Sequence, residues 1–176
     1  ILENAGYLSE KTAKQCGAVA YEHSNFLTPP DSRFEGRRIV PSLGHGSQID
    51  YFYAFANAIL LRNSDPEKTK DLAWVWHAMG KPTDSNGKSH REGYDLYKYL
   101  LPVYGHLLGD EKIVDSAKRR ARVVNSRWHP GWGAVMRAHA GDPNETYMAY
   151  RQGFMVSHAD PNQGDFVIHA KGTPLT

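Results

Sequence analysis

The sequence has little cysteine, little net charge and no long apolar run. Its single cysteine, Cys16, excludes a disulfide within the chain and a zinc module built on several cysteines. A formal net charge of +2 over 176 residues is too small to indicate a nucleic-acid partner. No run approaches the roughly 20 apolar residues that cross a membrane, so we expect no membrane-spanning segment.

The composition is that of a folded protein. Hydrophobic residues make up 40% of the chain and charged residues 23%, which is typical of globular rather than disordered proteins. The length is sufficient to bury a sizeable core. Because the chain begins with Ile1 and carries no signal-peptide pattern, we expect a piece of a longer protein, whose remainder would be a further partner.

Capping signals predict two helices in the first half of the chain. Ser9 is a suitable N-cap for a helix that ends at about His23. Ser64-Asp-Pro opens a second helix that ends near Gly80, with proline in the first turn. Apolar residues at helical spacing predict further helices over about 47–62, 92–108 and 110–124.

Two changes of composition along the chain mark a long loop and a domain boundary. Residues 24–46 are rich in Pro, Gly and Arg and predict a long loop, and loops of this length are more often functional than idle. After Asn125, helical spacing gives way to Trp, Gly, Pro and short apolar runs. We therefore expect a helical domain over residues 1–125 and a β-domain over residues 126–176.

The C-terminal stretch predicts antiparallel strands. Short runs with β-branched and aromatic residues, at Thr146–Tyr150, Phe154–Val156 and Phe166–Ile168, are separated by glycine and by an Asp-Pro-Asn turn. His158 lies at the edge of this turn and His169 on the strand that follows. An imidazole where a strand meets a loop is both held rigidly and accessible to a substrate.

A run near the end of the chain resembles a known family. From Arg151 to Leu175 it reads RQGFMVSHADPNQGDFVIHAKGTPL, which is similar to the start of the β-sandwich in the heparinase II/III-like polysaccharide lyases. The likeness covers residues 131–176. It implies a multidomain α+β fold, in which the helices of an incomplete (α/α) toroid precede an antiparallel β-sandwich.

An alignment without gaps gives the matched positions. His158 takes the place of the family's catalytic histidine, and Gly164 and Phe166 also match. The sequence departs from the family pattern at Asp160, where a metal-binding histidine is usual, and at Asn162, where aspartate is usual. These departures concern the metal site more than the catalytic histidine.

The resemblance implies β-elimination from a uronic-acid polysaccharide. The enzyme must offset the carboxylate charge, remove the proton at C5 and protonate the leaving oxygen. His158 is expected to be the base or to neutralise the carboxylate. The segment GHGSQIDYFY looks like the family's entry to a helix with a catalytic tyrosine, which makes Tyr51 the first choice and Tyr53 the alternative. His45 is expected as a cationic neighbour that favours the ionised tyrosine.

Several residue types suit an acidic polysaccharide as substrate. Arginine presents a bidentate fork to carboxylates and sulfates, although most arginines are surface residues or ion-pair partners. Tryptophan stacks on sugar rings, and two tryptophans lie in the Gly/Pro-rich junction. The candidates for substrate binding are Arg37, Arg38, Trp128, Trp132, Arg151 and Gln163.

A structural divalent ion, zinc or calcium, is a further expectation. Asp160, Asp165 and His169 offer oxygen and nitrogen donors within a short span, and period-2 alternation puts the last two on one face of a strand. A metal normally needs three or four convergent ligands, and the family's remaining ligands would lie beyond Thr176. A lone histidine on a strand is more often simply packed. No cofactor is expected to be required for the elimination itself.

Three functions follow from these observations. The first is a secreted, periplasmic or extracellular lyase acting on a glycosaminoglycan, alginate or ulvan. The second is a glycoside hydrolase on a similar toroid, which needs two facing carboxylates, and no such pair stands out in the sequence. The third is a non-catalytic carbohydrate-binding or matrix relative, which the replacement of the metal histidine by Asp160 favours.

Overall fold

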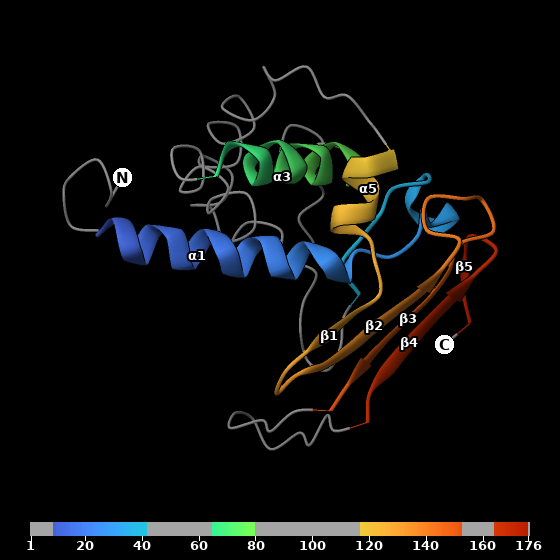
Figure 1. Cartoon of the computed structure of the whole chain (residues 1–176). Helices are drawn as coiled ribbons and strands as arrows, with labels where there is room; N and C mark the ends of the chain where they lie inside the picture. Colours follow the sequence, from blue (N-terminus) through green and yellow to red (C-terminus); the bar gives the residue numbers. More distant parts are fainter. Residues whose placement is uncertain (1–8, 42–64, 80–116, 153–163, 176) are drawn as a thin grey trace, which may run out of the picture. The chain divides into compact units, whose positions relative to one another are not determined.

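The computed structural model describes residues 9–41, 65–79, 117–152 and 164–175. The chain forms two compact units, the first from residues 1–23 and 51–114 and the second from residues 24–50 and 115–176. Helices and an antiparallel sheet confirm the α+β class at this coarse level (Figure 1). Within the described residues, no helix is long and apolar enough to cross a membrane.

Two helices are described in the first unit, α1 (Glu10–His23) and α3 (Pro66–Ala78). Ser9 caps α1, because its hydroxyl accepts a hydrogen bond from the backbone N–H three residues on (3.2 Å). Asp65 caps α3 in the same way (3.1 Å), and proline occupies the first turn, where its missing N–H costs no hydrogen bond. Both helices were predicted from these signals and are confirmed, whereas the segments predicted helical over 47–62 and 92–108 lie outside the described residues.

A buried hydrogen bond links α1 to α3. The Tyr21 hydroxyl donates to Asp71 Oδ2 over 3.0 Å, and both residues are buried. Leu72 and Val75 are buried on the same helix as Asp71. The hydroxyl thus satisfies a carboxylate that would be costly to bury without a donor.

The second unit is built on a five-stranded antiparallel sheet whose strands follow in chain order (Figure 1). The strands predicted at 146–150 and 166–168 are confirmed, and the one predicted at 154–156 lies outside the described residues. The strands are β1 (Arg127–His129), β2 (Gly133–Ala138), β3 (Thr146–Arg151), β4 (Phe166–Ala170) and β5 (Thr173–Pro174).

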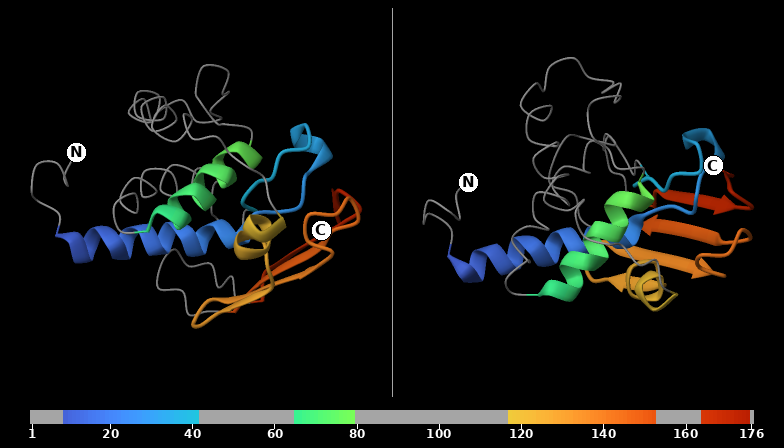
Figure 2. Two further views of the ribbon diagram at one scale, coloured as in Figure 1. Left: turned by 45° about the horizontal axis from the view of Figure 1, so that its top comes forward. Right: turned by 90° about the horizontal axis from the view of Figure 1, so that it is seen from above.

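Two segments that precede the sheet belong to the same unit. Helix α5 (Ala117–Val123) leads into β1, and residues 24–41 contain two 3-10 turns, η1 (Ser24–Phe26) and η2 (Ser32–Phe34). The η2 turn lies beside the β4–β5 turn, where the Ser32 N–H donates to Gly172 O over 3.4 Å (Figure 2). The second unit therefore starts before residue 126. The division into domains at residue 125, the toroid and the sandwich stay predictions.

One face of the sheet is a core. Val135, Tyr147 and Ala149, which alternate along β2 and β3, are buried together with Phe26 from η1. Residues that pack against them are Val40, Trp132 and Val167. Residues 24–41 thus supply the cover that this apolar face requires.

The other face of the sheet is open and uncharged. Alternation places apolar and small residues there, and no charged side chain occurs at these positions of the five strands. Trp128, Met136 and Phe166 are 64%, 47% and 46% exposed.

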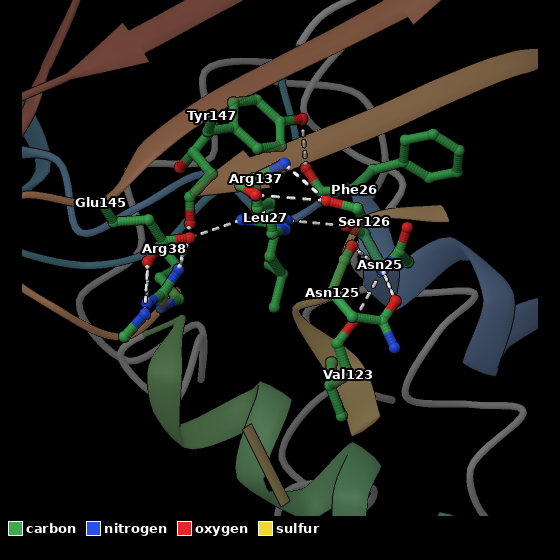
Figure 3. A network of polar contacts seen from close by, with 12 residues as sticks. Asn25, Phe26, Leu27, Arg38, Val123, Asn125, Ser126, Arg137, Glu145 and Tyr147 are labelled. Atoms are coloured by element: carbon green, nitrogen blue, oxygen red, sulfur yellow. Dashed lines mark hydrogen bonds and ion pairs between the residues drawn. The ribbon is translucent and has the colours of Figure 1, made fainter. Parts of the chain in front are cut away.

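A buried ionic network fixes residues 24–41 to the sheet (Figure 3). Glu145, which is 1% exposed, accepts hydrogen bonds from Arg38 (2.8 Å) and Arg137 (2.7 Å), and from the Gly141 N–H (2.9 Å). Burial raises the pKa of the Glu145 carboxyl, but its hydrogen bond and charge interaction with Arg38, and the charge of Arg137, outweigh burial and hold the pKa below its usual value. The carboxylate therefore stays ionised between two buried cations.

The same network satisfies three successive carbonyl groups (Figure 3). Arg137 donates to Asn25 O (2.8 Å) and to Leu27 O, and the Tyr147 hydroxyl donates to Phe26 O (2.8 Å). Burial raises the pKa of Tyr147, which keeps its hydroxyl a donor. Because irregular backbone at a buried position needs such partners, the network determines where residues 25–27 lie.

Replacement of Glu145 by Gln is expected to lower the free energy of unfolding by about 3–5 kcal/mol, since it leaves two buried arginines without a counter-charge. Urea unfolding followed by circular dichroism measures the loss. The control is Glu35→Gln, because Glu35 is 87% exposed and only 3.6 Å from Arg37, an ion pair that water screens.

The pH dependence gives an internal check on the same variant. The folded-state pKa of Glu145 is depressed, so its contribution is present above its unfolded pKa of about 4.5 and is lost as the pH falls through the folded value. The difference in free energy of unfolding between wild type and Glu145→Gln should therefore shrink as the pH falls below about 4.5. A difference that is constant down to acid pH would contradict the ionised carboxylate.

Candidate functional site

Several predicted site residues gather at one end of the sheet, which we call the loop end. Here β1 ends at His129, β2 begins at Gly133, β3 ends at Arg151 and β4 begins at Phe166 (Figure 1). Neighbouring antiparallel strands run in opposite directions, so these four positions lie side by side. The connection from β3 to β4, which holds the His158 motif in the sequence, starts and finishes at this end.

Backbone hydrogen bonds fix both roots of that connection to the sheet. The Arg151 N–H donates to Asp165 O (2.8 Å), and the Gly164 N–H donates to Arg151 O (2.9 Å). The Gln152 N–H donates to Trp132 O in the β1–β2 turn (2.8 Å). The residues that flank the His158 motif are therefore held in place by two neighbouring elements.

Arg151 and Trp132, both predicted to bind substrate, lie together at the loop end. The Arg151 guanidinium carbon is 5.9 Å from the centroid of the Trp132 ring, within the range of a cation–π interaction. The same ring packs on Phe26, with the ring centroids 4.3 Å apart. The Trp132 ring thus contacts both the core of the unit and a cationic side chain at the loop end.

Gly133 lies between a histidine and an arginine, at a point where neighbouring strands approach closely. His129, Gly133 and Arg151 form a row across three strands on the core face. Gly133 has a φ of 154°, and a Cβ there would collide with Tyr150 O, so the backbones approach as only glycine allows. The outer two residues of the row are about 10 Å apart, or two strand spacings, with the Trp132 ring near both.

The structure adds Asn25 and His129, which the sequence analysis did not single out. Asn25 Oδ1 is 3.0 Å from His129 Nε2, and the His129 ring lies against Phe26 with the centroids 4.6 Å apart. The signal in the sequence is the histidine directly before the Pro-Gly turn. Its partner is 104 residues away along the chain, so no local pattern could have paired them.

Trp128 and Trp132 were predicted as a pair, but they lie on different faces of the sheet. Trp132 packs on the core face, whereas Trp128 lies on the open face in a cross-strand row that continues through Ala134 to Tyr150 and Phe166. The two rings therefore do not line one common surface.

The two remaining arginine candidates lie away from the loop end. Arg38 is buried, and its guanidinium is bound to Glu145 directly before β3. Arg37 is partly exposed beside η2, where its Nε donates to Phe34 O (2.9 Å). Binding of a polysaccharide by Arg37 and Arg38 stays a prediction, and in this structure Arg38 stabilises the fold.

The expected metal ligands are spread along β4. Asp165 directly precedes the strand at the loop end, and His169 follows four residues on, so their Cα atoms are about 13 Å apart. His169 is buried against the Tyr147 ring (5.8 Å), and burial lowers its pKa although the Asp31 carboxylate opposes this. At this separation Asp165 and His169 do not converge on one ion. In the described parts of the chain, no three His, Cys, Asp or Glu side chains form a group that could hold an ion.

The other predicted site residues lie outside the described part of the chain. They are His45, Tyr51, Tyr53, His158, Asp160 and Gln163. Comparisons with protein-family models, with curated proteins and with solved structures found no match.

Replacement of Gly133 by Ala is expected to lower the free energy of unfolding by more than about 2 kcal/mol, because the new Cβ clashes with the neighbouring backbone and the φ is unfavourable for alanine. The matched control is Gly131→Ala in the adjacent turn, which also has a positive φ (77°) but meets no atom within 4 Å. That control should lose only about 1–2 kcal/mol. Equal losses in the two variants would show that the close approach at Gly133 is absent.

Proposed function

We propose that this protein is a polysaccharide lyase that cleaves a uronic-acid-containing polysaccharide by β-elimination outside the cell. The observation that carries the proposal is the loop end. There the connection with the lyase-like His158 motif is anchored beside Arg151 and Trp132 by three backbone hydrogen bonds. The side chains beside the roots of this connection are those that an acidic sugar requires.

Each part of the reaction has a candidate in the sequence. The Arg151 guanidinium can hold the uronate carboxylate by two parallel hydrogen bonds, and its positive charge supports the enolate-like intermediate. The Trp132 ring offers a face for the sugar. His158 acts as base or neutralises the carboxylate, and Tyr51 or Tyr53 gives a proton to the leaving oxygen, assisted by His45.

Asp31 and Glu145, two buried carboxylates of the second unit, do not have the properties of a glycosidase acid. A glycosidase needs a general acid with a raised pKa. Burial raises the pKa of Asp31, but its hydrogen bonds with Arg33 (2.9 and 3.2 Å) outweigh burial and leave the pKa below its usual value. Glu145 is likewise held ionised by Arg38 and Arg137. Neither carboxyl is suited to protonate a leaving group.

Incubation of the full-length protein with glycosaminoglycans, alginate and ulvan should give ultraviolet absorbance from unsaturated ends with at least one polymer. His158→Ala should abolish this signal, because removal of a base or of a carboxylate partner costs about 100-fold to 10,000-fold in rate. Circular dichroism of the variant controls for folding.

The other results of this assay contradict the proposal in different ways. New reducing ends without the absorbance would indicate a hydrolase. Binding without either signal would indicate a non-catalytic carbohydrate-binding relative. A His158→Ala variant that is unfolded as well as inactive would show that this histidine stabilises the fold.

Tyr51→Phe is expected to reduce kcat by at least about 100-fold with little change in KM, since it removes a proton donor and keeps the ring. Tyr53→Phe is the matched control, two residues along the same segment. Steady-state kinetics on the best polymer measures both variants. If Tyr53→Phe is the inactive one, the role belongs to Tyr53, and if both are fully active the acid is another group.

A further inference from the structure

The connection between β2 and β3 contains the acceptor sequence for N-glycosylation. Residues 144–146 read Asn-Glu-Thr, which fits the pattern Asn-x-Ser/Thr with a residue other than proline in the middle. No other asparagine of the sequence is followed two residues later by serine or threonine. Because so short a pattern also arises by chance, its value depends on the structure around it.

Two consecutive turns determine where Asn144 lies. The Asp142 N–H donates to His139 O, and the Glu145 N–H donates to Asp142 O, over 2.9 Å in both cases. Pro143 occupies the second position of the second turn, where its fixed φ is favourable. Asp142 Oδ1 also accepts from the Asn144 N–H (2.7 Å), as aspartate commonly does in turns. The backbone of Asn144 is thus fixed without the use of its own side chain.

The three side chains of the acceptor sequence differ in their surroundings. Asn144 and Thr146 are exposed, whereas Glu145 between them is buried and bound to the two arginines of the ionic network. In the described part of the chain, neither the Asn144 amide nor the Thr146 hydroxyl forms a hydrogen bond. The turn is therefore held by its backbone and by the carboxylates of Asp142 and Glu145, and the amide of Asn144 is accessible to another molecule.

We propose that Asn144 is an N-glycosylation site. Its ligand is an oligosaccharide, and the donor is an oligosaccharide linked to a lipid through a diphosphate. The inference rests on the location outside the cell in the proposed function, because the acceptor sequence is used on the surface of secreted proteins. It does not depend on the lyase reaction.

The transfer balances without an oxidant or a reductant. A bond forms between Asn144 Nδ2 and the anomeric carbon of the first sugar. The bond from that carbon to the diphosphate oxygen breaks, and its electron pair leaves with the diphosphate. Nδ2 loses one of its two protons and keeps the other, so the product is a neutral secondary amide. The Thr146 hydroxyl is available for recognition by the transferase and is not consumed.

The site lies at the end of the sheet opposite the loop end (Figure 1). Strand β3 begins at Thr146 and ends at Arg151, a length of about 17 Å. Since Glu145 is buried and the Asn144 amide is exposed, an oligosaccharide on this amide does not displace the ionic network. We therefore expect it to leave both the fold and the loop end unchanged.

Secretion of the full-length protein from cultured eukaryotic cells, with a secretory signal peptide added, tests the site. The intact mass should show one oligosaccharide per chain. An amidase that releases N-linked oligosaccharides should remove it and leave an aspartate, so release in ¹⁸O-labelled water marks the position for peptide mass spectrometry. A secreted chain without an oligosaccharide, or with one only at a residue other than Asn144, would overturn the inference.

Three variants of exposed positions are the matched controls. Asn144→Gln removes the acceptor and Thr146→Val removes the hydroxyl, so both should be secreted without the oligosaccharide. Thr146→Ser keeps a hydroxyl and should retain it. Circular dichroism of the secreted variants checks that they are folded. An oligosaccharide that persists in Asn144→Gln would contradict the assignment, as would its complete loss in Thr146→Ser.

Activity assays separate this inference from the proposed function. If the secreted protein eliminates a uronate polymer, its kcat and KM should be the same before and after release of the oligosaccharide, and a change would contradict its placement away from the loop end. An active lyase that is secreted without an oligosaccharide overturns the site alone. A chain that carries the oligosaccharide on Asn144 but eliminates no polymer overturns the lyase function and supports the site.

Discussion

The carboxylate of Glu145 is the group on which the second unit depends. It balances two arginines that are otherwise too costly to bury. These arginines then donate to the carbonyls of Asn25, Leu27 and Thr28. The carboxylate thus determines, through Arg38 and Arg137, where residues 25–28 lie on the sheet, although those residues have no regular secondary structure beyond a single 3-10 turn.

Residues 25–28 contact groups at both ends of the sheet. Their carbonyls bind the network that Glu145 holds together, while their side chains reach toward the loop end, where Phe26 supports Trp132 and Asn25 binds His129. Arginines therefore serve two purposes in one unit. Arg137 donates to carbonyls and to a carboxylate inside the fold. Arg151 lies against an aromatic ring at the loop end, beside the roots of the connection that carries His158.

Local signals predicted α1, α3, β3 and β4, since caps and alternation act over a few residues. Ser9, the proline after Asp65 and the runs at β3 and β4 are of this kind. The burial of Arg38 was not predictable, because its partner is 107 residues away. The same holds for the pair of Asn25 and His129. Alternation correctly put Asp165 and His169 on one face, but a shared face does not bring residues together when a strand extends by about 3.3 Å at each step.

Elimination at a uronate makes opposite demands on neighbouring groups. The carboxylate needs donors and positive charge, whereas the C5 proton, one carbon away, needs a lone pair. One side chain cannot meet both demands at the same time, so the two roles require two groups held apart. In the row from His129 to Arg151 an imidazole and a guanidinium are separated by a residue without a side chain. Arginine has no acceptor atom, so in the proposed reaction Arg151 can serve only the carboxylate. The lone pair that takes the C5 proton must then come from a second side chain.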